Sequence, residues 1–306
     1  MLEASVLLPP GGAVTGWAAA RWRGAGYFDG LAHDGRTLRP ILLAVGVGGD
    51  LREREGIRVS RDRLRGDEVT SVRGVSCTTI ERALFDEMRK ADDVREAVVA
   101  MDMVAAAELT SVRRMRVFAE VRTGWNGRPQ VMAALALACE DSMSPAETRL
   151  RLVWVLDARL PPSRVNCPVF DLGGDLLGVA DLFDPIAGVV GEYDGAAHRQ
   201  AGRHRHDVLR EDRFRRAGLE YFKVVGLDMR DTDLVVDRML STRARARFLP
   251  PAERRWTLAV PPHWSDDPLA TASLDERLAH REWLAALHTE QPGGGASGEP
   301  GPHLGR

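Results

Sequence analysis

The chain has 306 residues, enough for about two domains, and its hydrophobic content of 44% is enough to build buried cores. A net charge of −2 argues against a general polyanion binder, so nucleic-acid binding would require a local basic patch. Cys77, Cys139 and Cys167 are widely separated and form no CxxC pair, so neither a zinc site nor a disulfide framework is indicated. No apolar run approaches the length of a bilayer span, and we expect a cytoplasmic protein with no membrane partner.

Residues 1–141 are expected to form a mainly helical α+β domain. Short apolar runs predict strands at 41–45 and 57–60, and residues 14–22 are expected to form a short helix. Apolar residues at helical spacing predict further helices over about 79–90, 94–105, 110–121 and 129–139. Thr78 with Glu81 fits a capping box for the first of these helices, and Thr110 fits the N-cap of the third.

A second domain is expected over residues 142–250. Ser144, Pro145 and Glu147 combine a cap serine, a proline in the first helical turn and a glutamate at N3. The helix that follows should reach about Ala158. The later pattern predicts three strands, a helix, a strand and a helix, at about 165–171, 179–183, 189–193, 197–217, 219–225 and 231–247. This order predicts a mixed sheet flanked by helices.

Residues 251–306 are expected to be a C-terminal extension. A last helix is predicted at about 274–287. The Gly- and Pro-rich residues from about 291 onward predict a disordered tail.

Three carboxylates are predicted to lie on one face of a hairpin in the second domain. If the hairpin closes symmetrically about the turn 184–188, Asp181 faces Glu192 with Cβ atoms about 4.5–5.5 Å apart. Asp194 follows on the same side as Glu192 because strand side chains alternate. Such carboxylates repel one another, and Mg²⁺ or Mn²⁺ would remove that cost. The alternative is that Asp181 is a hydrogen-bonded strand-end residue and that Glu192 and Asp194 lie in a solvated turn.

The helix after this hairpin is basic. Seven arginines lie between 199 and 216, against Asp207, Glu211 and Asp212. Arginine guanidinium groups suit phosphate oxygens, and the candidate contacts to DNA are Arg199, Arg203, Arg205, Arg210 and Arg213. The alternative is a solvated face of ion pairs at helical spacing, such as Glu211 with Arg215.

The motifs S-P-x-E, V-A-D and E-Y-D-G-x-x-H, in this order over about 142–247, resemble the PD-(D/E)XK nuclease superfamily. More narrowly, they resemble its branch related to very-short-patch-repair (Vsr-like) endonucleases. The resemblance implies a restriction-endonuclease-like α/β fold. It implies that Asp181 is the metal-binding aspartate, Glu192 the first acidic residue of (D/E)-x-K, and Glu147 the acidic residue of the preceding helix. For Glu147 alone, the alternative is that it only completes a capping box with Ser144.

The lysine position of this motif holds Asp194. In Vsr-like enzymes histidines take over the lysine's role, which implies such a role for His198. Lys223, on the following strand, is a second candidate for a migrated lysine. The alternative for His198 is that it only opens the helix expected from about residue 197.

The N-terminal part resembles, more weakly, the AbiEi family of antitoxins and regulators. The motifs are W-A-A-A-R-W-R-G at 17–24, R-G-V-S-C-T-T-I-E-R-A-L-F-D at 73–86 and V-V-A-M-D-M at 98–103. Members of that family begin with a winged helix-turn-helix, and too little chain precedes Trp17 to build one. The resemblance therefore implies a scaffold or a contact with a protein partner.

Together these patterns predict a Mg²⁺- or Mn²⁺-dependent DNA endonuclease. The alternative is a non-catalytic DNA-binding or regulatory protein of a toxin–antitoxin or phage-defence system, with a degenerate nuclease fold. A third hypothesis is a protein-interaction module in which the carboxylates and the capping box are purely structural.

Overall fold

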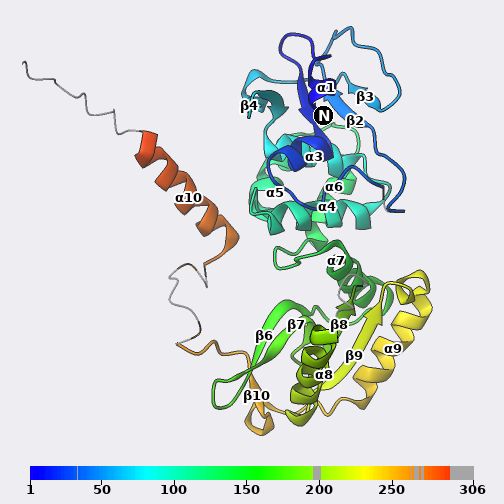
Figure 1. Cartoon of the computed structure of the whole chain (residues 1–306), viewed down its shortest axis with the longest axis vertical. Helices are drawn as coiled ribbons and strands as arrows, with labels where there is room; N and C mark the ends of the chain where they lie inside the picture. Colours follow the sequence, from blue (N-terminus) through cyan, green and yellow to red (C-terminus); the bar gives the residue numbers. More distant parts are fainter. Residues whose placement is uncertain (33, 196–200, 263, 265–268, 270–271, 290–306) are drawn as a thin grey trace, which may run out of the picture.

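The computed structural model describes residues 1–32, 34–195, 201–262, 264, 269 and 272–289, without the side chains of 201–207 and 286–289. Within these residues the chain is a mixed α/β protein with two separate five-stranded sheets. Figure 1 shows the two sheets at opposite ends of the long axis, with a layer of helices between them.

The first sheet has the strand order β3-β2-β1-β5-β4. Its strands are β1 (Ala13–Thr15), β2 (Ile41–Ala44), β3 (Ile57–Ser60), β4 (Val69–Val72) and β5 (Val75–Thr78). Strand β1 lies at the centre, antiparallel to β2 and parallel to β5. The strands predicted at 41–45 and 57–60 are confirmed, whereas the sequence pattern does not predict the β4–β5 hairpin.

The prediction of a helix over residues 14–22 is wrong for the first residues of that range. Ala13, Val14 and Thr15 are fully buried and form β1, and helix α2 covers Gly16–Trp22. A run this short and buried has no periodicity that distinguishes a strand from a helix. The φ of +64° at Gly16, which glycine adopts without strain, lets the chain turn from the strand into the helix.

Helices α3 to α6 form the layer next to this sheet, and a short helix α1 (Leu2–Ser5) precedes β1. They are α3 (Ile80–Arg89), α4 (Val94–Ala106), α5 (Val112–Glu120) and α6 (Arg128–Leu137). Thr79 caps α3 and Ser111 caps α5, so the caps expected at Thr78 and Thr110 are each one residue too early. Both of these threonines are buried and use their hydroxyls in tertiary contacts, Thr78 with Thr15 and Thr110 with Glu81.

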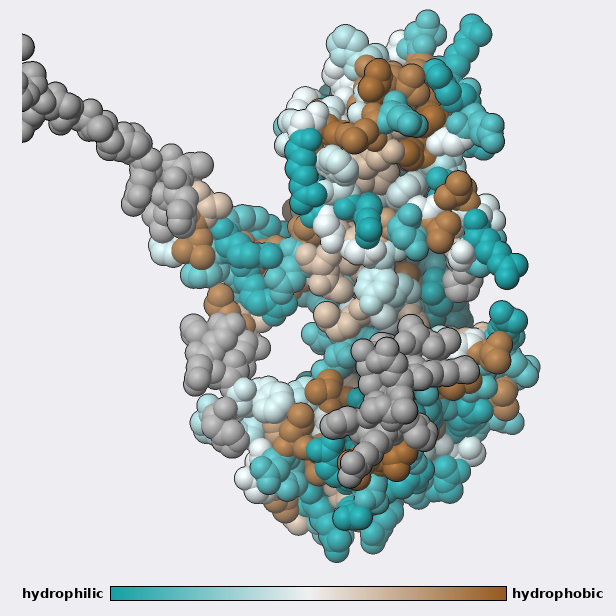
Figure 2. All heavy atoms as spheres, in the orientation of Figure 1, coloured by the Kyte–Doolittle hydropathy of each residue, from teal (hydrophilic) through white to brown (hydrophobic). Residues whose placement is uncertain are grey.

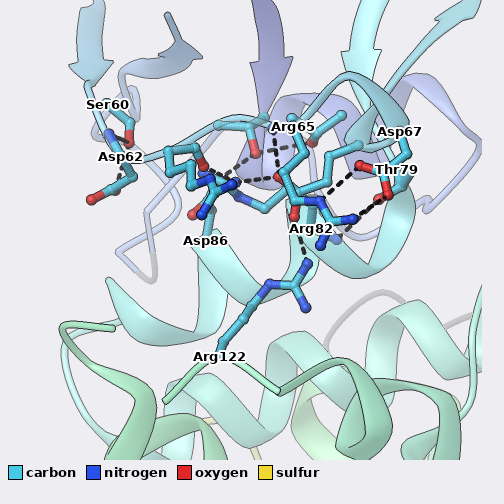
Figure 3. A network of polar contacts seen from close by, with 12 residues as sticks. Ser60, Asp62, Arg65, Asp67, Thr79, Arg82, Asp86 and Arg122 are labelled. Carbon is cyan, nitrogen blue, oxygen red and sulfur yellow. Dashed lines mark hydrogen bonds and ion pairs between the residues drawn. The ribbon is translucent and has the colours of Figure 1, made fainter. Parts of the chain in front are cut away.

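A buried polar network ties the first sheet to α3 and α5 (Figure 3). At its centre, the fully buried Arg82 of α3 donates to Asp86 at 3.0 Å and to Glu68 at 2.9 Å. Arg122 donates to the other oxygen of Glu68 at 2.5 Å, and Thr15 of β1 donates to Asp86 at 2.8 Å. These charges are buried but paired, as the interior of a protein requires. Arg82 and Asp86 belong to the 73–86 motif, and this part of the motif is structural.

The second sheet has the strand order β10-β6-β7-β8-β9. Its strands are β6 (Arg164–Asp171), β7 (Leu176–Asp184), β8 (Val189–Asp194), β9 (Glu220–Val225) and β10 (Trp256–Thr257). Strands β6, β7 and β8 are antiparallel neighbours, and β9 lies parallel to β8. The four longer strands confirm the predicted ones, and the short edge strand β10 is an addition.

Helices cover both faces of this sheet. Helix α8 (Ala201–Arg216) packs Phe214 on one face, against Val190 and Tyr221 among others. On the opposite face lie α7 (Pro145–Leu152), a π-helical turn at Val153–Asp157 and α9 (Thr232–Arg245), around the buried Trp154. These elements agree with the predicted helices within a few residues.

The described part of the C-terminal extension contacts both the second sheet and the core of the first part of the chain. Strand β10 pairs with β6, and helix α10 (Leu274–Thr289) returns to the first part of the chain, where Leu274 and Leu278 are buried in its core. Because Leu152 of α7 also belongs to that core, the division at 141/142 stays a prediction. The tail expected from about 291 lies outside the described residues.

On the face shown in Figure 2, hydrophilic residues predominate and apolar ones occur in small groups. No helix in the described part of the chain is long and apolar enough to cross a membrane.

Candidate functional site

Asp181 and Glu192 lie on neighbouring strands of the second sheet. The β7–β8 ladder pairs Leu182 with Gly191 and Phe183 with Val190, and the same register places Asp181 across from Glu192. Regular pairing ends there, because the Asp181 Oδ2 atom accepts the backbone N–H of Tyr193 at 2.8 Å. The relation between the two carboxylates that the hairpin pattern predicts is therefore present. Asp181 is hydrogen-bonded, as in the alternative interpretation, but it lies within β7 and not at the end of the strand.

Asp181 binds its proton unusually tightly. Burial, together with the carboxylates of Glu192 and Glu147, raises its pKa to about 7, although the Tyr193 N–H and Arg210 oppose the shift. Mutual repulsion between carboxylates is the cost that a bound cation removes. The third carboxylate near Asp181 is thus Glu147, from α7.

Glu192 is almost completely buried, at 1% exposure. Its Oε2 atom accepts from Arg210 Nη2 at 2.5 Å and from the Tyr221 hydroxyl at 2.7 Å. Its Oε1 atom is buried and has no hydrogen-bond partner among the described residues. Burial raises the pKa of Glu192, while Arg210, Tyr221 and Lys223 oppose that shift. A buried acceptor with no donor is costly, and it marks a place that an added ligand could occupy.

Glu147 has a capping role in the structure. Its Oε1 atom accepts from the Ser144 hydroxyl at 2.8 Å, and Oε2 accepts from Met143 N at 2.9 Å and from Asn166 Nδ2 at 2.7 Å. The Ser144 hydroxyl in turn accepts the Glu147 N–H, as the predicted cap requires. A role as metal ligand would require Glu147 to give up some of these contacts.

Asp194 and Lys223 form a pair at the end of the site. Lys223 Nζ lies 3.6 Å from Asp194 Oδ2, and both side chains are about one-third exposed. The parallel ladder pairs Glu192 with Lys223, so Lys223 lies beside Glu192 on the same face of the sheet. The carboxylate predicted at Asp194 is therefore neutralised by Lys223, and the migrated lysine predicted at 223 lies at the site.

The basic helix contributes Arg210 to the site. Arg210, predicted to contact phosphate, is instead paired with Glu192, and Arg213 reaches the Leu176 carbonyl at 3.3 Å. The ion pair between Glu211 and Arg215, at 2.9 Å, is the solvated contact of the alternative interpretation. His198 and Arg199 lie outside the described residues, as do the side chains of Arg203 and Arg205.

Two glycines allow the close packing that positions these side chains. A Cβ atom on Gly178 of β7 would lie 2.7 Å from Phe214 Cζ and 2.9 Å from Arg210 Cγ, so a larger residue would push α8 away. A Cβ atom on Gly191 would lie 2.3 Å from Phe222 Cζ. Both contacts are shorter than packed carbon atoms allow.

The described acidic side chains at the site, Asp181, Glu192 and Glu147, offer oxygen atoms as metal ligands. Oxygen ligands suit Mg²⁺ and Mn²⁺ and do not suit the softer thiolate-bound metals. In their present positions, no three His, Cys, Asp or Glu side chains of the described ranges are arranged as a metal site. The partnerless Glu192 Oε1 and the shifted pKa of Asp181 nevertheless fit a divalent cation at these two residues.

Sequence reasoning missed two features of the site. Tyr221 precedes Lys223 by two residues on β9, and alternation along that strand places both on the face that carries Glu192. The pairing of Arg210 with Glu192 depends on how closely α8 packs on β7, which no local pattern encodes.

We compared the chain with protein-family models, curated proteins and solved structures, and none of them matches it.

Proposed function

We propose that the protein is a DNA endonuclease that uses Mg²⁺ or Mn²⁺ to hydrolyse phosphodiester bonds. The observation that carries the proposal is the pair Asp181 and Glu192. Glu192 is buried, one of its oxygens has no hydrogen-bond partner among the residues that the structure describes, and the pKa of Asp181 is raised to about 7. Such a pair is unfavourable on its own and becomes favourable when a cation neutralises it.

The order of elements supports this proposal. A helix, three antiparallel strands, a second helix and a strand parallel to the third follow one another from α7 to β9. This order supports the restriction-endonuclease-like arrangement that we propose from the resemblance to PD-(D/E)XK nucleases, in which Asp181 and Glu192 would lie on the second and third strands.

Each residue has a stated role in the proposed reaction. Asp181 and Glu192 would hold the cation, with Glu147 completing the shell after it releases a capping contact. When bound, the cation polarises the phosphate and makes an attacking water more acidic. Lys223, beside Glu192, would stabilise negative charge that develops on the phosphate.

Proton transfer needs a further group. We assign it to His198, whose ordinary pKa of about 6.5 allows it to accept a proton from water or to donate one to the leaving oxygen. Lys223 is the alternative, and replacing each residue in turn would distinguish them.

Plasmid nicking tests the proposal. Wild-type protein should nick supercoiled DNA with Mg²⁺ or Mn²⁺ and lose this activity in EDTA. Asp181→Asn and Glu192→Gln should each lower the rate by at least about 100-fold, because each removes a charged ligand. Asp171→Asn, at the end of β6 in the same sheet, is the control and should cut at the wild-type rate. Unchanged nicking by Asp181→Asn would exclude the proposed site.

The second candidate is a non-catalytic DNA-binding or regulatory protein. The observation that favours it is the Asp194–Lys223 pair, because Asp194 at the lysine position neutralises the lysine that would replace it. DNA binding at low salt that needs no divalent ion, together with no nicking, would select this candidate. We also propose that the N-terminal part contacts a protein partner, as its AbiEi resemblance implies.

A further inference from the structure

We propose that Arg210 is an internal counter-cation, which holds Glu192 in the metal-free protein and moves to a DNA phosphate when a divalent cation binds. The inference rests on the proposed function, because it takes Asp181 and Glu192 to be the cation site. It adds that metal binding and DNA binding are coupled through one arginine side chain.

The first argument is the charge that surrounds Glu192. A carboxylate buried to 1% exposure needs a counter-charge, and Arg210 supplies it at 2.5 Å. Tyr221 binds the same oxygen but is neutral, because burial and Glu192 raise the pKa of its phenol well above the ordinary value. Lys223, the other cation beside Glu192, is shared with Asp194.

The second argument is the position of Arg210. Its stem passes over Gly178, where only the missing Cβ leaves room, and its side chain is 31% exposed. The guanidinium thus reaches a buried carboxylate from the surface of α8. A side chain anchored in this way can turn outward without unfolding the helix.

The third argument is competition. A divalent cation on Glu192 would neutralise the carboxylate and repel the guanidinium, so the ion pair with Arg210 would lose its advantage. A phosphate oxygen then becomes the better partner, because arginine binds phosphate through two parallel hydrogen bonds. Cation binding would therefore create a phosphate contact at the scissile position.

This exchange predicts that Arg210→Gln binds Mn²⁺ more tightly but gains less DNA affinity from Mn²⁺ than the wild type does. Removing the competing charge should tighten Mn²⁺ binding without DNA by about tenfold or more. The same change should abolish the increase in DNA affinity that Mn²⁺ produces in the wild type. A purely structural role for Arg210 predicts weaker Mn²⁺ binding instead, because the site would lose its shape.

The experiment combines calorimetry and fluorescence anisotropy on the full chain. Mn²⁺ is titrated into wild type, Arg210→Gln and the control Arg216→Gln at about pH 8, above the pKa of Asp181, so that its carboxyl is ionised. A labelled duplex with hydrolysis-resistant phosphorothioate linkages is then titrated in EDTA and in Mn²⁺. Arg216→Gln, on the same helix but paired with Asp212 at the surface, should keep wild-type metal affinity.

The outcomes separate the two proposals. Tighter Mn²⁺ binding by Arg210→Gln, with the metal-dependent gain in DNA affinity lost, supports the exchange. If the wild type binds Mn²⁺ and Arg210→Gln binds it equally well or more weakly, the exchange is overturned, while the proposed function stays in place. No Mn²⁺ binding by either protein overturns both. If Arg210→Gln does not fold, Arg210→Lys replaces it, and its metal affinity should exceed that of the wild type because an ammonium group does not reproduce the guanidinium contact to Glu192 Oε2.

Discussion

Tyr221 donates its hydroxyl to Glu192 Oε2, the oxygen that Arg210 also binds, over a distance of 2.7 Å. Both donors therefore act on one oxygen, and no group in the described part of the chain donates to the other oxygen of Glu192. The phenol remains protonated, and so a donor, at neutral pH, because burial and Glu192 raise its pKa well above the ordinary value. Tyr221 thus fixes the carboxylate that the proposed site depends on.

Replacing Tyr221 by phenylalanine tests this contact. The ring still packs against Phe214, but a buried charged acceptor loses one donor, which should lower the free energy of unfolding by about 1.5–3 kcal/mol. Urea unfolding monitored by circular dichroism measures the change. The control Tyr27→Phe, at an exposed tyrosine, should unfold like the wild type. A Tyr221→Phe protein as stable as the control would show that the hydrogen bond contributes nothing.

Asp181→Asn should make stability less sensitive to pH. The folded pKa of about 7 lies above the ordinary aspartate value of 3.8, so the folded state binds the proton more tightly. The stability that Asp181 contributes is fully present below the pKa of the unfolded state and is lost as the pH rises through the pKa of the folded state. Asparagine removes that loss and keeps an oxygen for the Tyr193 N–H. The variant should therefore gain about 2–4 kcal/mol over the wild type at about pH 8 and less at about pH 5.

Urea unfolding of both proteins at several pH values measures this gain in metal-free buffer. The variant's advantage must grow as the pH rises from acid to neutral. An advantage that is constant across the pH range would mean that Asp181 has an ordinary pKa.

Asp102 is the buried junction between α4, α7 and the segment that joins α6 to α7. It accepts from Cys139 N at 2.8 Å, Thr148 Oγ1 at 3.0 Å and Arg151 Nη2 at 2.9 Å. Asp102→Ala would leave the Arg151 guanidinium buried without its counter-charge, and should cost about 3–5 kcal/mol of stability. The more exposed pair of Glu96 with Arg149 is the comparison, and Glu96→Ala should cost no more than about 1 kcal/mol. Thermal and urea unfolding measure both losses, and an equal loss of stability in Asp102→Ala and Glu96→Ala would contradict this ranking.

Helix α10 should detach locally when its apolar anchor is removed. Leu278 is buried at 5% exposure in the core of the N-terminal part, and Arg114 pairs with Glu282 beside it. Leu278→Ala should raise hydrogen exchange of the α10 amides by about tenfold or more and leave β7 and β8 unchanged, because the lost burial is local. Trp283→Ala, at a side chain 57% exposed, is the control. Equal exchange in the two variants would mean that Leu278 does not anchor the helix.

The local patterns of the second sheet were sufficient to predict its central features. A Pro/Gly turn between two apolar runs determines a hairpin register, and that register places Asp181 across from Glu192. Ser144, Pro145 and Glu147 predict the start of α7 because capping is a local interaction. The nuclease interpretation built on these residues stays a proposal.

Other features depend on contacts between distant segments. Strand β1 has three residues, and its identity comes from pairing with β2 and β5. The cap at Thr79 instead of Thr78 follows from burial of Thr78 against Thr15, a partner 63 residues away. In the same way, the pairing of Lys223 with Asp194 and of Arg210 with Glu192 depends on how β9 and α8 pack on β8 and β7. None of these relations has a signal within a short stretch of sequence.

The most direct test of the account is calorimetric titration of Mg²⁺ and Mn²⁺ into wild-type and Asp181→Asn protein, without DNA. We expect the wild type to bind the cation and Asp181→Asn to lose most of the binding heat, with Asp171→Asn behaving like the wild type. Binding that is equal in the wild type and Asp181→Asn, or no binding in any of the three, would contradict a cation site at Asp181 and Glu192.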